Sequence, residues 1–347
     1  MGEVLSAGAP VIEVAPERLQ LAVARALAPH AAAAGGGFAA QDADRAACWI
    51  VQAEQLGLAG FGVDMLLRDL RRVDIGSRSA DAVAAPSAVG AIAGIDAAGT
   101  PGPLALAAAV RIAEAAVESH GIGLVGVRNV GALGVLGLAA RSLAERGRVA
   151  LISAQAPAMV APWGGSAPAI GTNPLAFGAP RAGGAPLVAD FATSRITLAE
   201  LRRRRDAGEQ LPEDVAIDAE GRPTADPDAV AALLPEGRLG SLAGLLVEVI
   251  AGAAVGGRAP AGAPADGRGA VVIAVDPARA GGARVAETCA EIAEEWRAAG
   301  GHVPGRFDAL GSSSSDTSEA PGAPDASIRL RQTDFDALFA RAEEARA

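Results

Sequence analysis

The spacing of apolar and polar residues predicts helices and strands that alternate along most of the chain. Helical patterns, the first two with Pro or Asp near their starts, cover 16–29, 40–57, 61–72, 102–119, 133–146, 196–207, 238–255, 279–299 and 332–346. Short apolar runs predict strands at 123–129, 149–153, 174–179, 188–194 and 270–275. This alternation is typical of an α/β fold.

Shifts in composition divide the chain further. Residues 1–15 resemble a loose arm, and the Ser/Ala/Pro-rich run at 311–327 is typical of a disordered linker. We expect a helical N-terminal segment that packs with the C-terminal part (1–75), a central α/β cofactor and substrate domain (76–257), a returning α/β segment (258–310), a flexible linker (311–331) and a C-terminal helix (332–347).

Residues 149–180 contain no charged side chain, although the chain has a net charge of −10. A membrane span is the first explanation for so long an uncharged run. Five prolines, from Pro157 to Pro180, argue against it, because each removes a backbone donor that hydrocarbon cannot replace. We predict buried sheet edges and the floor of a cleft instead, with no membrane partner.

The composition limits which chemistry the chain can perform. Its negative net charge argues against nucleic acid as a partner, because binding to the phosphate backbone relies on clustered basic residues. Cys48 and Cys289 have no metal-type neighbours, so we predict no metal site, reduced thiols and a cytoplasmic location. The chain contains neither lysine nor tyrosine. Lysine Schiff bases and Tyr/Lys proton relays are therefore excluded.

Two conspicuous motifs have ordinary structural interpretations. Gly121–Gly126 matches the G-x-G-x-x-G dinucleotide pattern, but it follows a predicted helix and precedes a strand, the reverse of the required order. We expect these glycines to end that helix. The basic run Arg202–Arg205 is expected on solvated surface. It could contact a 2′-phosphate only if its helix faced the cleft.

Asp190 is the first carboxylate after Glu145, and it stands at the end of a predicted strand beside the uncharged stretch. Burial in such a cleft would shift the pKa of its carboxyl group, as happens at many functional sites. The alternative interpretation is an N-cap for the helix predicted at 196–207. The pattern alone leaves both interpretations open.

The chain contains the blocks PWGGSAPAIGTNPLAFGAP (162–180), VADFATS (188–194), IDAEGRPTADPDA (217–229) and VPGR (303–306). These blocks resemble the malate/L-lactate dehydrogenase family, which includes sulfolactate and ureidoglycolate dehydrogenases and cyclic ketimine reductases. The resemblance covers roughly residues 10–307. It implies a non-Rossmann α/β fold with a helical N-terminal part and a mixed-sheet cofactor domain. It also implies a homodimer and hydride transfer between NADPH or NADH and a small 2-oxo or 2-imino acid.

The resemblance implies roles for particular residues. Three segments would bind the cofactor, namely Gly171, Thr172, Asn173 and Pro174, then Ala192, Thr193 and Ser194, and finally Pro304, Gly305 and Arg306. Asp190 would be the catalytic carboxylate. The substrate pocket would include Phe61, Arg128, Asn129, Ala132 and Trp163. Glycine and proline suit a cofactor wall, because their backbone approaches a ligand closely and does not titrate.

The chain departs from the family pattern where the chemistry should occur. Ala132 replaces the histidine that donates a proton to the substrate oxygen. In the segment that would hold the substrate carboxylate, Phe61 stands at a histidine position and Met65 at an arginine position. Leu239 stands at the position of a family lysine, with Arg238 adjacent.

These departures leave three hypotheses open. A ketone reductase without the histidine would lose about 10²- to 10⁴-fold in rate, whereas a cyclic iminium arrives protonated, so imine reduction fits Ala132 better. The chain could instead be a cyclase, lyase or isomerase that uses Asp190, or a non-catalytic homologue. The family partners that would keep Asp190 ionised are missing, so we expect burial to raise its pKa.

Overall fold

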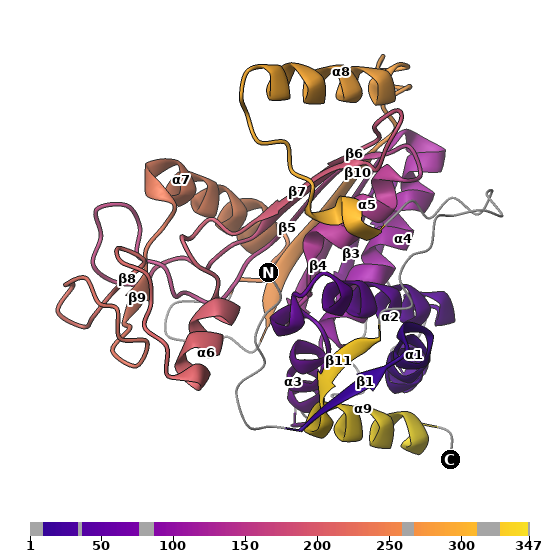
Figure 1. Cartoon of the computed structure of the whole chain (residues 1–347). Coiled ribbons are helices and arrows are strands. Elements are labelled where there is room, and N and C mark those ends of the chain that lie inside the picture. The colour runs from indigo at the N-terminus through magenta and orange to yellow at the C-terminus, as the bar shows by residue number, and fades with distance from the viewer. Residues whose placement is uncertain (1–9, 34–36, 76–86, 259–266, 311–326, 346–347) are drawn as a thin grey trace.

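The computed structural model describes residues 10–33, 37–75, 87–258, 267–310 and 327–345. These residues form a seven-stranded mixed sheet and a separate layer of helices drawn from both ends of the chain (Figure 1). The arrangement agrees with the predicted α/β fold class, with its helical N-terminal part and mixed sheet. No helix in the described ranges combines the length and apolar character that a membrane crossing requires.

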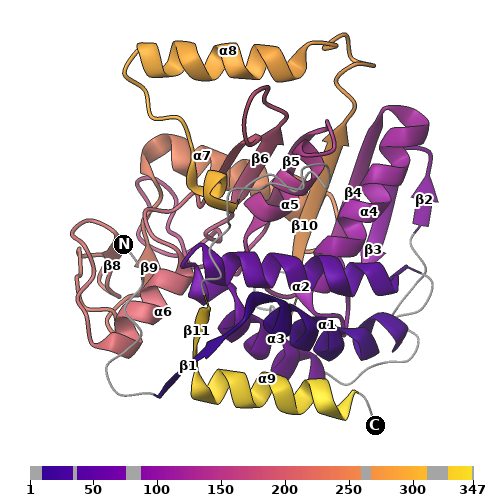
Figure 2. The ribbon, with the colours of Figure 1, turned by 45° about the vertical axis from the view of Figure 1, so that its right-hand side comes forward.

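The helical layer joins the two ends of the chain (Figure 2). It consists of α1 (Pro16–Ala33), α2 (Ala40–Gln55), the short η1 (Ala59–Phe61), α3 (Val63–Ile75) and α9 (Gln332–Glu344). Leu338 of α9 is fully buried in the core that includes α1 and α3. The guanidinium of Arg18 lies over the rings of Phe335 and Phe339, 5.4 and 5.1 Å from their centroids.

Two short strands close this layer. β1 (Val11–Val14) pairs antiparallel with β11 (Ile328–Arg331), and Val11 lies opposite Arg331. The expected loose arm is therefore wrong for β1, and the expected linker is wrong for β11. Each strand has four residues and takes its hydrogen bonds from the other end of the chain, so neither is visible in local sequence. Residues 311–326 of the expected linker lie outside the described residues.

The central sheet has the strand order β2-β3-β4-β10-β5-β6-β7. Its strands are β2 (Ser87–Val89), β3 (Ile92–Asp96), β4 (Ile122–Val130), β10 (Arg268–Val275), β5 (Val149–Ala154), β6 (Leu175–Ala179) and β7 (Leu187–Phe191). β3 and β4 are parallel, and the other neighbours are antiparallel. We expected a boundary between the central α/β domain and a returning segment after residue 257. β10 follows that position but lies between β4 and β5, so the two segments share one sheet.

Side chains of β10 alternate between two apolar clusters, as expected for a strand with helices on both faces. Val272 packs in the cluster that contains α4 (Gly102–His120) and α5 (Leu136–Ala144). Val271 packs with α7 (Gly237–Val247) and the π-helical turn η2 (Glu248–Ala253). α4 ends at Gly121, whose φ of +79° forms a left-handed cap. This confirms the structural interpretation of the glycine motif.

The remaining elements flank the sheet. α6 (Leu198–Ala207) and the strand pair β8 (Ala216–Ile217) and β9 (Ala232–Leu233) lie together on one side (Figure 1). α8 (Val285–Ala298) lies across the sheet from the helical layer, and the short η3 (Arg306–Leu310) returns from it toward α5 (Figure 2).

The pairing of the chain ends generates a stability prediction. Leu338→Ala should lower the free energy of unfolding by about 2–5 kcal/mol, because it leaves a cavity between α9 and the N-terminal helices. Leu21→Ala on α1 is the matched control, since Leu21 is 50% exposed. Urea denaturation followed by circular dichroism measures both. Equal, small effects of the two changes would show that α9 contributes little to the core.

Candidate active site

A cavity of about 570 Å³ lies between the sheet and the helical layer. Its walls come from η1, α3, the loop between β4 and α5 (131–135), the segments after β5 and β7, and α6. Arg268 at the start of β10 and Arg306 of η3 complete the lining. This volume falls within the range of about 300–1,000 Å³ that is usual for small-molecule sites.

The cavity brings together many of the residues that the family resemblance implicated. The lining includes Phe61, Ala132, Thr172, Pro174, Asp190, Ala192, Ser194 and Arg306. Gly134 has a φ of +85°, and a Cβ there would lie 3.4 Å from Met65 Cε and 3.5 Å from the Phe61 carbonyl oxygen. The segment with Phe61 and Met65 and the loop with Ala132, which both depart from the family pattern, therefore lie next to each other at one end of the cavity.

The cavity wall is supported by three residues that do not line it, namely Gly171, Asn173 and Thr193. The buried carboxylate of Glu248 accepts hydrogen bonds from the Gly171 N–H and from Asn173 Nδ2, both at 3.1 Å. The Thr193 N–H donates to the Thr172 carbonyl at 3.0 Å. These contacts fix the segments around Thr172 and Thr193 to each other and to η2. This side of the cavity therefore has a well-supported wall.

The structure places Arg128, Asn129 and Trp163 outside the cavity, contrary to the predicted substrate pocket. Asp96 is the register partner of Arg128 on β3, and its carboxylate pairs with the Arg128 guanidinium at 3.0 Å. The same carboxylate accepts from Asn129 Nδ2 at 2.8 Å. Trp163 is 59% exposed, and its backbone N–H donates to Ser241 Oγ of α7 at 3.0 Å.

Pro304 and Gly305 also lie outside the cavity, but they lead into η3, whose Arg306 lines it. Phe307, the next residue, is buried and packs against the start of α5. A Cβ on Gly137 would lie 2.3 Å from Phe307 Cζ, so only glycine allows this approach. The close packing of η3 on α5 therefore positions Arg306 at the site.

Asp190 makes a different helix contact from the one that the sequence suggested. Its Oδ2 accepts a hydrogen bond from the Gly137 N–H at 2.7 Å, in the first turn of α5. The cap of α6 is Thr197, whose Oγ1 accepts from the Glu200 N–H at 3.1 Å. The proposed role of Asp190 as N-cap of α6 is therefore wrong, because β7 directs this carboxylate toward α5.

Burial raises the pKa of the Asp190 carboxyl group to about 6, which confirms the expected direction. The Gly137 N–H and the charge of Arg306 oppose this rise, because both stabilise the carboxylate. A carboxyl group with this pKa can both give and take a proton near neutral pH.

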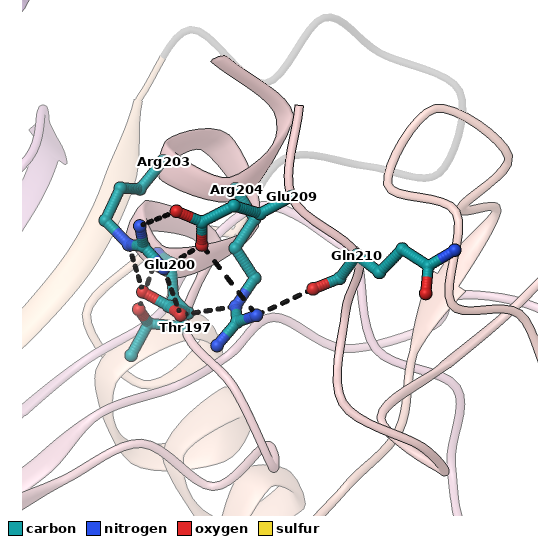
Figure 3. Close-up of polar contacts among 6 residues, drawn as sticks. All are labelled: Thr197, Glu200, Arg203, Arg204, Glu209 and Gln210. Carbon is teal, nitrogen blue, oxygen red and sulfur yellow. Dashed lines mark hydrogen bonds and ion pairs between the residues drawn. The ribbon is translucent and has the colours of Figure 1, made fainter. Parts of the chain in front are cut away.

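Arg202 and Arg205 are exposed, and Arg203 and Arg204 are half-buried, so the predicted solvated surface holds for most of this run. The guanidinium groups of Arg203 and Arg204 bind Glu200 and Glu209 (Figure 3). Arg202 is exposed and also lines the cavity. The helix therefore faces the cleft through one arginine of the four.

The sequence analysis missed four further arginines of the lining, namely Arg68, Arg72, Arg195 and Arg268. Arg68 and Arg72 are four residues apart on α3 and share a helix face with Met65, so their spacing was a usable signal. Arg268 carried no such signal, because its position depends on where β10 enters the sheet.

Comparison with known proteins gives consistent matches. The model of the family described as malate/L-lactate dehydrogenase matches residues 20–306. The chain is 39% identical over 207 residues to (2R)-3-sulfolactate dehydrogenase (NADP(+)) of Chromohalobacter salexigens, a match covering 58% of this chain and 61% of that protein. It is 37% identical over 218 residues to Δ1-pyrroline-2-carboxylate/Δ1-piperideine-2-carboxylate reductase of Pseudomonas putida, covering 59% and 64%. Both matches span less than two thirds of the relatives' length.

A solved structure extends the likeness over nearly the whole chain. The crystal structure of Δ1-piperideine-2-carboxylate reductase from Pseudomonas syringae pvar. tomato superposes with a TM-score of 0.77. The two sequences are 28% identical, and the match covers 95% of this chain and 99% of that one. The family model alone covers most of the chain, from α1 to the start of η3. The chain therefore belongs to the malate/L-lactate dehydrogenase family.

Proposed function

We propose that the chain is an NAD(P)H-dependent reductase that acts on a small cyclic 2-imino acid or a related 2-oxo acid. One observation carries the proposal: a single cavity contains an uncharged wall, the Asp190 carboxyl group with a pKa of about 6, and Ala132. Family membership supports hydride transfer, and the names of several relatives specify cyclic imino acids as their substrates.

The residues present fit a nicotinamide dinucleotide, either NADPH or NADH. Thr172, Pro174, Ala192 and Ser194 offer an uncharged surface for its ring, and they lie on segments fixed from behind. Arg306 is an exposed cation at the cavity and would neutralise phosphate charge. The cofactor supplies a hydride when bound.

Asp190 would donate a proton to the substrate. A cyclic imine accepts hydride more readily after its nitrogen is protonated, and a carboxyl group with a pKa of about 6 can deliver that proton. Ala132 supplies no second acid, so a ketone would have to receive its proton from Asp190 alone, whereas a cyclic imine can also arrive already protonated. Imine reduction is therefore the redox reaction that this set of side chains supports best.

The surroundings of the two cysteines support a cytoplasmic location. Cys48 and Cys289 are both free thiols. Burial raises the pKa of both thiol groups, which keeps them unreactive. Free, unreactive thiols are usual in reducing compartments.

We also propose a homodimer, supported by an apolar stripe along α7 and η2. Leu239, Leu242, Leu246 and Val249 follow helical spacing and are 78, 54, 51 and 52% exposed. An exposed stripe of this kind is typical of a protein interface. The same surface patch of each subunit would form this interface, and the two patches would be related by a two-fold axis.

Asp190→Asn should lower turnover of Δ1-piperideine-2-carboxylate by about 100-fold or more, the usual contribution of a general acid. Oxidation of NADPH or NADH, followed by absorbance, measures the rate. Fluorescence titration should show unchanged cofactor affinity in the variant. A fully active variant would remove Asp190 from the mechanism, and wild-type protein that binds neither cofactor would contradict the proposed function.

The raised pKa of Asp190 also predicts how stability varies with pH. The folded pKa of about 6 lies above the ordinary value of 3.8, so this group stabilises the fold below about pH 4 and loses that contribution as pH rises through 6. Asparagine does not titrate. The melting temperature of Asp190→Asn, relative to wild type, should therefore rise between pH 4 and 7. A difference that stays constant would show that Asp190 titrates normally.

Light scattering tests the homodimer. Wild-type protein should have about twice the chain mass of 34.3 kDa. Leu242→Arg places a charge in the proposed interface and should give monomers, whereas Leu21→Arg, on another exposed leucine, should leave the dimer intact. A monomeric wild type, or dissociation by both variants, would contradict the assignment of α7.

A further inference from the structure

The buried carboxylate of Glu248 takes no part in the proton transfer proposed above. Glu248 is the first residue of η2, and only 4% of its surface is exposed. A buried carboxylate is costly unless nearby groups compensate for the solvation that it loses. π-helical turns such as η2 are rare and occur frequently at functional sites. The partners of Glu248 therefore indicate what this residue does.

Glu248 belongs to a row of residues along α7 and η2 that faces the cavity wall. Gly240, Gly244 and Glu248 are four residues apart, so they lie on one face of the helix. A Cβ on Gly240 would lie 2.5 Å from the Thr193 carbonyl oxygen, and a Cβ on Gly244 would lie 3.1 Å from Thr193 Oγ1. The two glycines bring the helix close to the wall, and Glu248 reaches the wall with a charged side chain.

The carboxylate of Glu248 binds a fully buried asparagine. Its Oε1 accepts hydrogen bonds from Asn173 Nδ2 and from the Gly171 N–H, both at 3.1 Å. Asn173 Nδ2 also donates to the Gly244 carbonyl at 2.8 Å, and Asn173 Oδ1 accepts from the Ala156 N–H at 2.9 Å. Both ends of this amide group are occupied, so it joins α7 and η2 to two segments of the wall.

Asn173 has a backbone conformation that few residues adopt. Its φ is +33°, on the positive side that asparagine tolerates better than most other residues do. Such conformations persist where the surrounding contacts determine them. The flanking residues, Thr172 and Pro174, both line the cavity. The hydrogen bonds of the Asn173 side chain therefore determine how these two residues face the cavity.

Glu248 supplies a charge that the wall itself lacks. Residues 149–180 contain no charged side chain, and hydrogen bonds to an ionised acceptor are about twice as strong as neutral ones. Glu248 Oε2 lies 3.3 Å from Arg258 Nε, and the Arg258 side chain is 54% exposed. The pair with Arg258 is thus accessible to solvent, whereas the hydrogen bonds to Gly171 and Asn173 are buried.

We propose that Glu248 is a positioning residue for the cofactor. Its carboxylate acts through Asn173 and Gly171, and it holds Thr172 and Pro174 where the nicotinamide ring contacts them. This inference rests on the proposed function, because it assigns a role in the same site. Hydride transfer requires a defined distance between the ring and the substrate, and a misplacement of about 1 Å can lower a rate about 100-fold. Loss of the Glu248 contacts should therefore affect the rate of transfer more than cofactor affinity.

Three variants separate the charge, the hydrogen bonds and the exposed ion pair. Glu248→Gln keeps an oxygen acceptor but removes the charge, Glu248→Leu removes both, and Arg258→Gln is the matched control. Stopped-flow absorbance measures single-turnover oxidation of NADPH by Δ1-piperideine-2-carboxylate. The rate should fall about 10-fold in Glu248→Gln and about 100-fold in Glu248→Leu. NADPH affinity should change less than about threefold, and Arg258→Gln should match wild type.

The fluorescence lifetime of bound NADPH reports how firmly the ring is held, without any turnover. A rigidly held nicotinamide ring has a longer lifetime than a mobile one, so the lifetime should shorten in both Glu248 variants. Asn173→Gly removes the amide group and permits the positive φ. Because Glu248 acts largely through this amide, Glu248→Gln should lower the rate less in the Asn173→Gly background than in wild type.

Three results would overturn the proposal. Both Glu248 variants could keep the wild-type rate and lifetime, NADPH affinity could fall as far as the rate does, or Arg258→Gln could reproduce the effect of Glu248→Gln. Thermal unfolding shows which variants are folded. If Glu248→Leu does not fold, Glu248→Gln decides the outcome, because it preserves the shape of the side chain.

Failure of the proposed function gives a different result. Wild-type protein that binds neither NADPH nor NADH would contradict that function. Hydrogen exchange of the free protein, followed by mass spectrometry, would then decide whether Glu248 holds the wall. Peptides that contain the Ala156 and Gly171 amides should exchange faster in Glu248→Gln than in wild type or Arg258→Gln. Equal exchange in all three proteins would exclude the positioning role.

Discussion

The cavity exists because β10 is hydrogen bonded between β4 and β5. This strand is antiparallel to both neighbours, so its first residue, Arg268, lies where they end. The loops that leave β4 and β5 at this edge, 131–135 and 155–157, then separate and form two sides of the cavity. If β10 were added at the edge of the sheet, β4 and β5 would pair directly. The two loops would then leave adjacent strands, with no arginine between them.

The lining combines two kinds of ionisable group that respond differently to burial. Asp190 responds by holding its proton to a higher pH, because a neutral carboxyl group loses less solvation energy than a carboxylate. Arginine has no such option at accessible pH, so the arginines of the lining, such as Arg202 and Arg268, keep their charge. Attraction of an anionic ligand should therefore vary little with pH, whereas proton transfer varies strongly. The two functions are separable because different residues perform them.

Local pattern and family resemblance predicted different parts of this molecule. The spacing of apolar residues located the long helices and the inner strands, because those elements bury one continuous face. Resemblance led to Asp190, but it gave no information on which way β4 directs its side chains, so Arg128 was misplaced. Arg202 could not be distinguished from its three neighbours, because the face that α6 buries is set by one contact, that of the fully buried Leu201. Strands β1 and β11 depend wholly on each other, and no local signal shows such a pair.

The antiparallel contact between β1 and β11 has a consequence for synthesis. The helices α1, α2 and α3 leave the ribosome early, yet the surface that covers them belongs to β11 and α9, which are made after the entire sheet. Contacts this distant in sequence form slowly, and apolar faces that wait for them are exposed to chaperones and to other nascent chains. The helices α1, α2 and α3 are thus covered only after β11 and α9 have been made. Since α3 forms one side of the cavity, a nascent chain acquires a complete binding site only after β11 and α9 have paired with this layer.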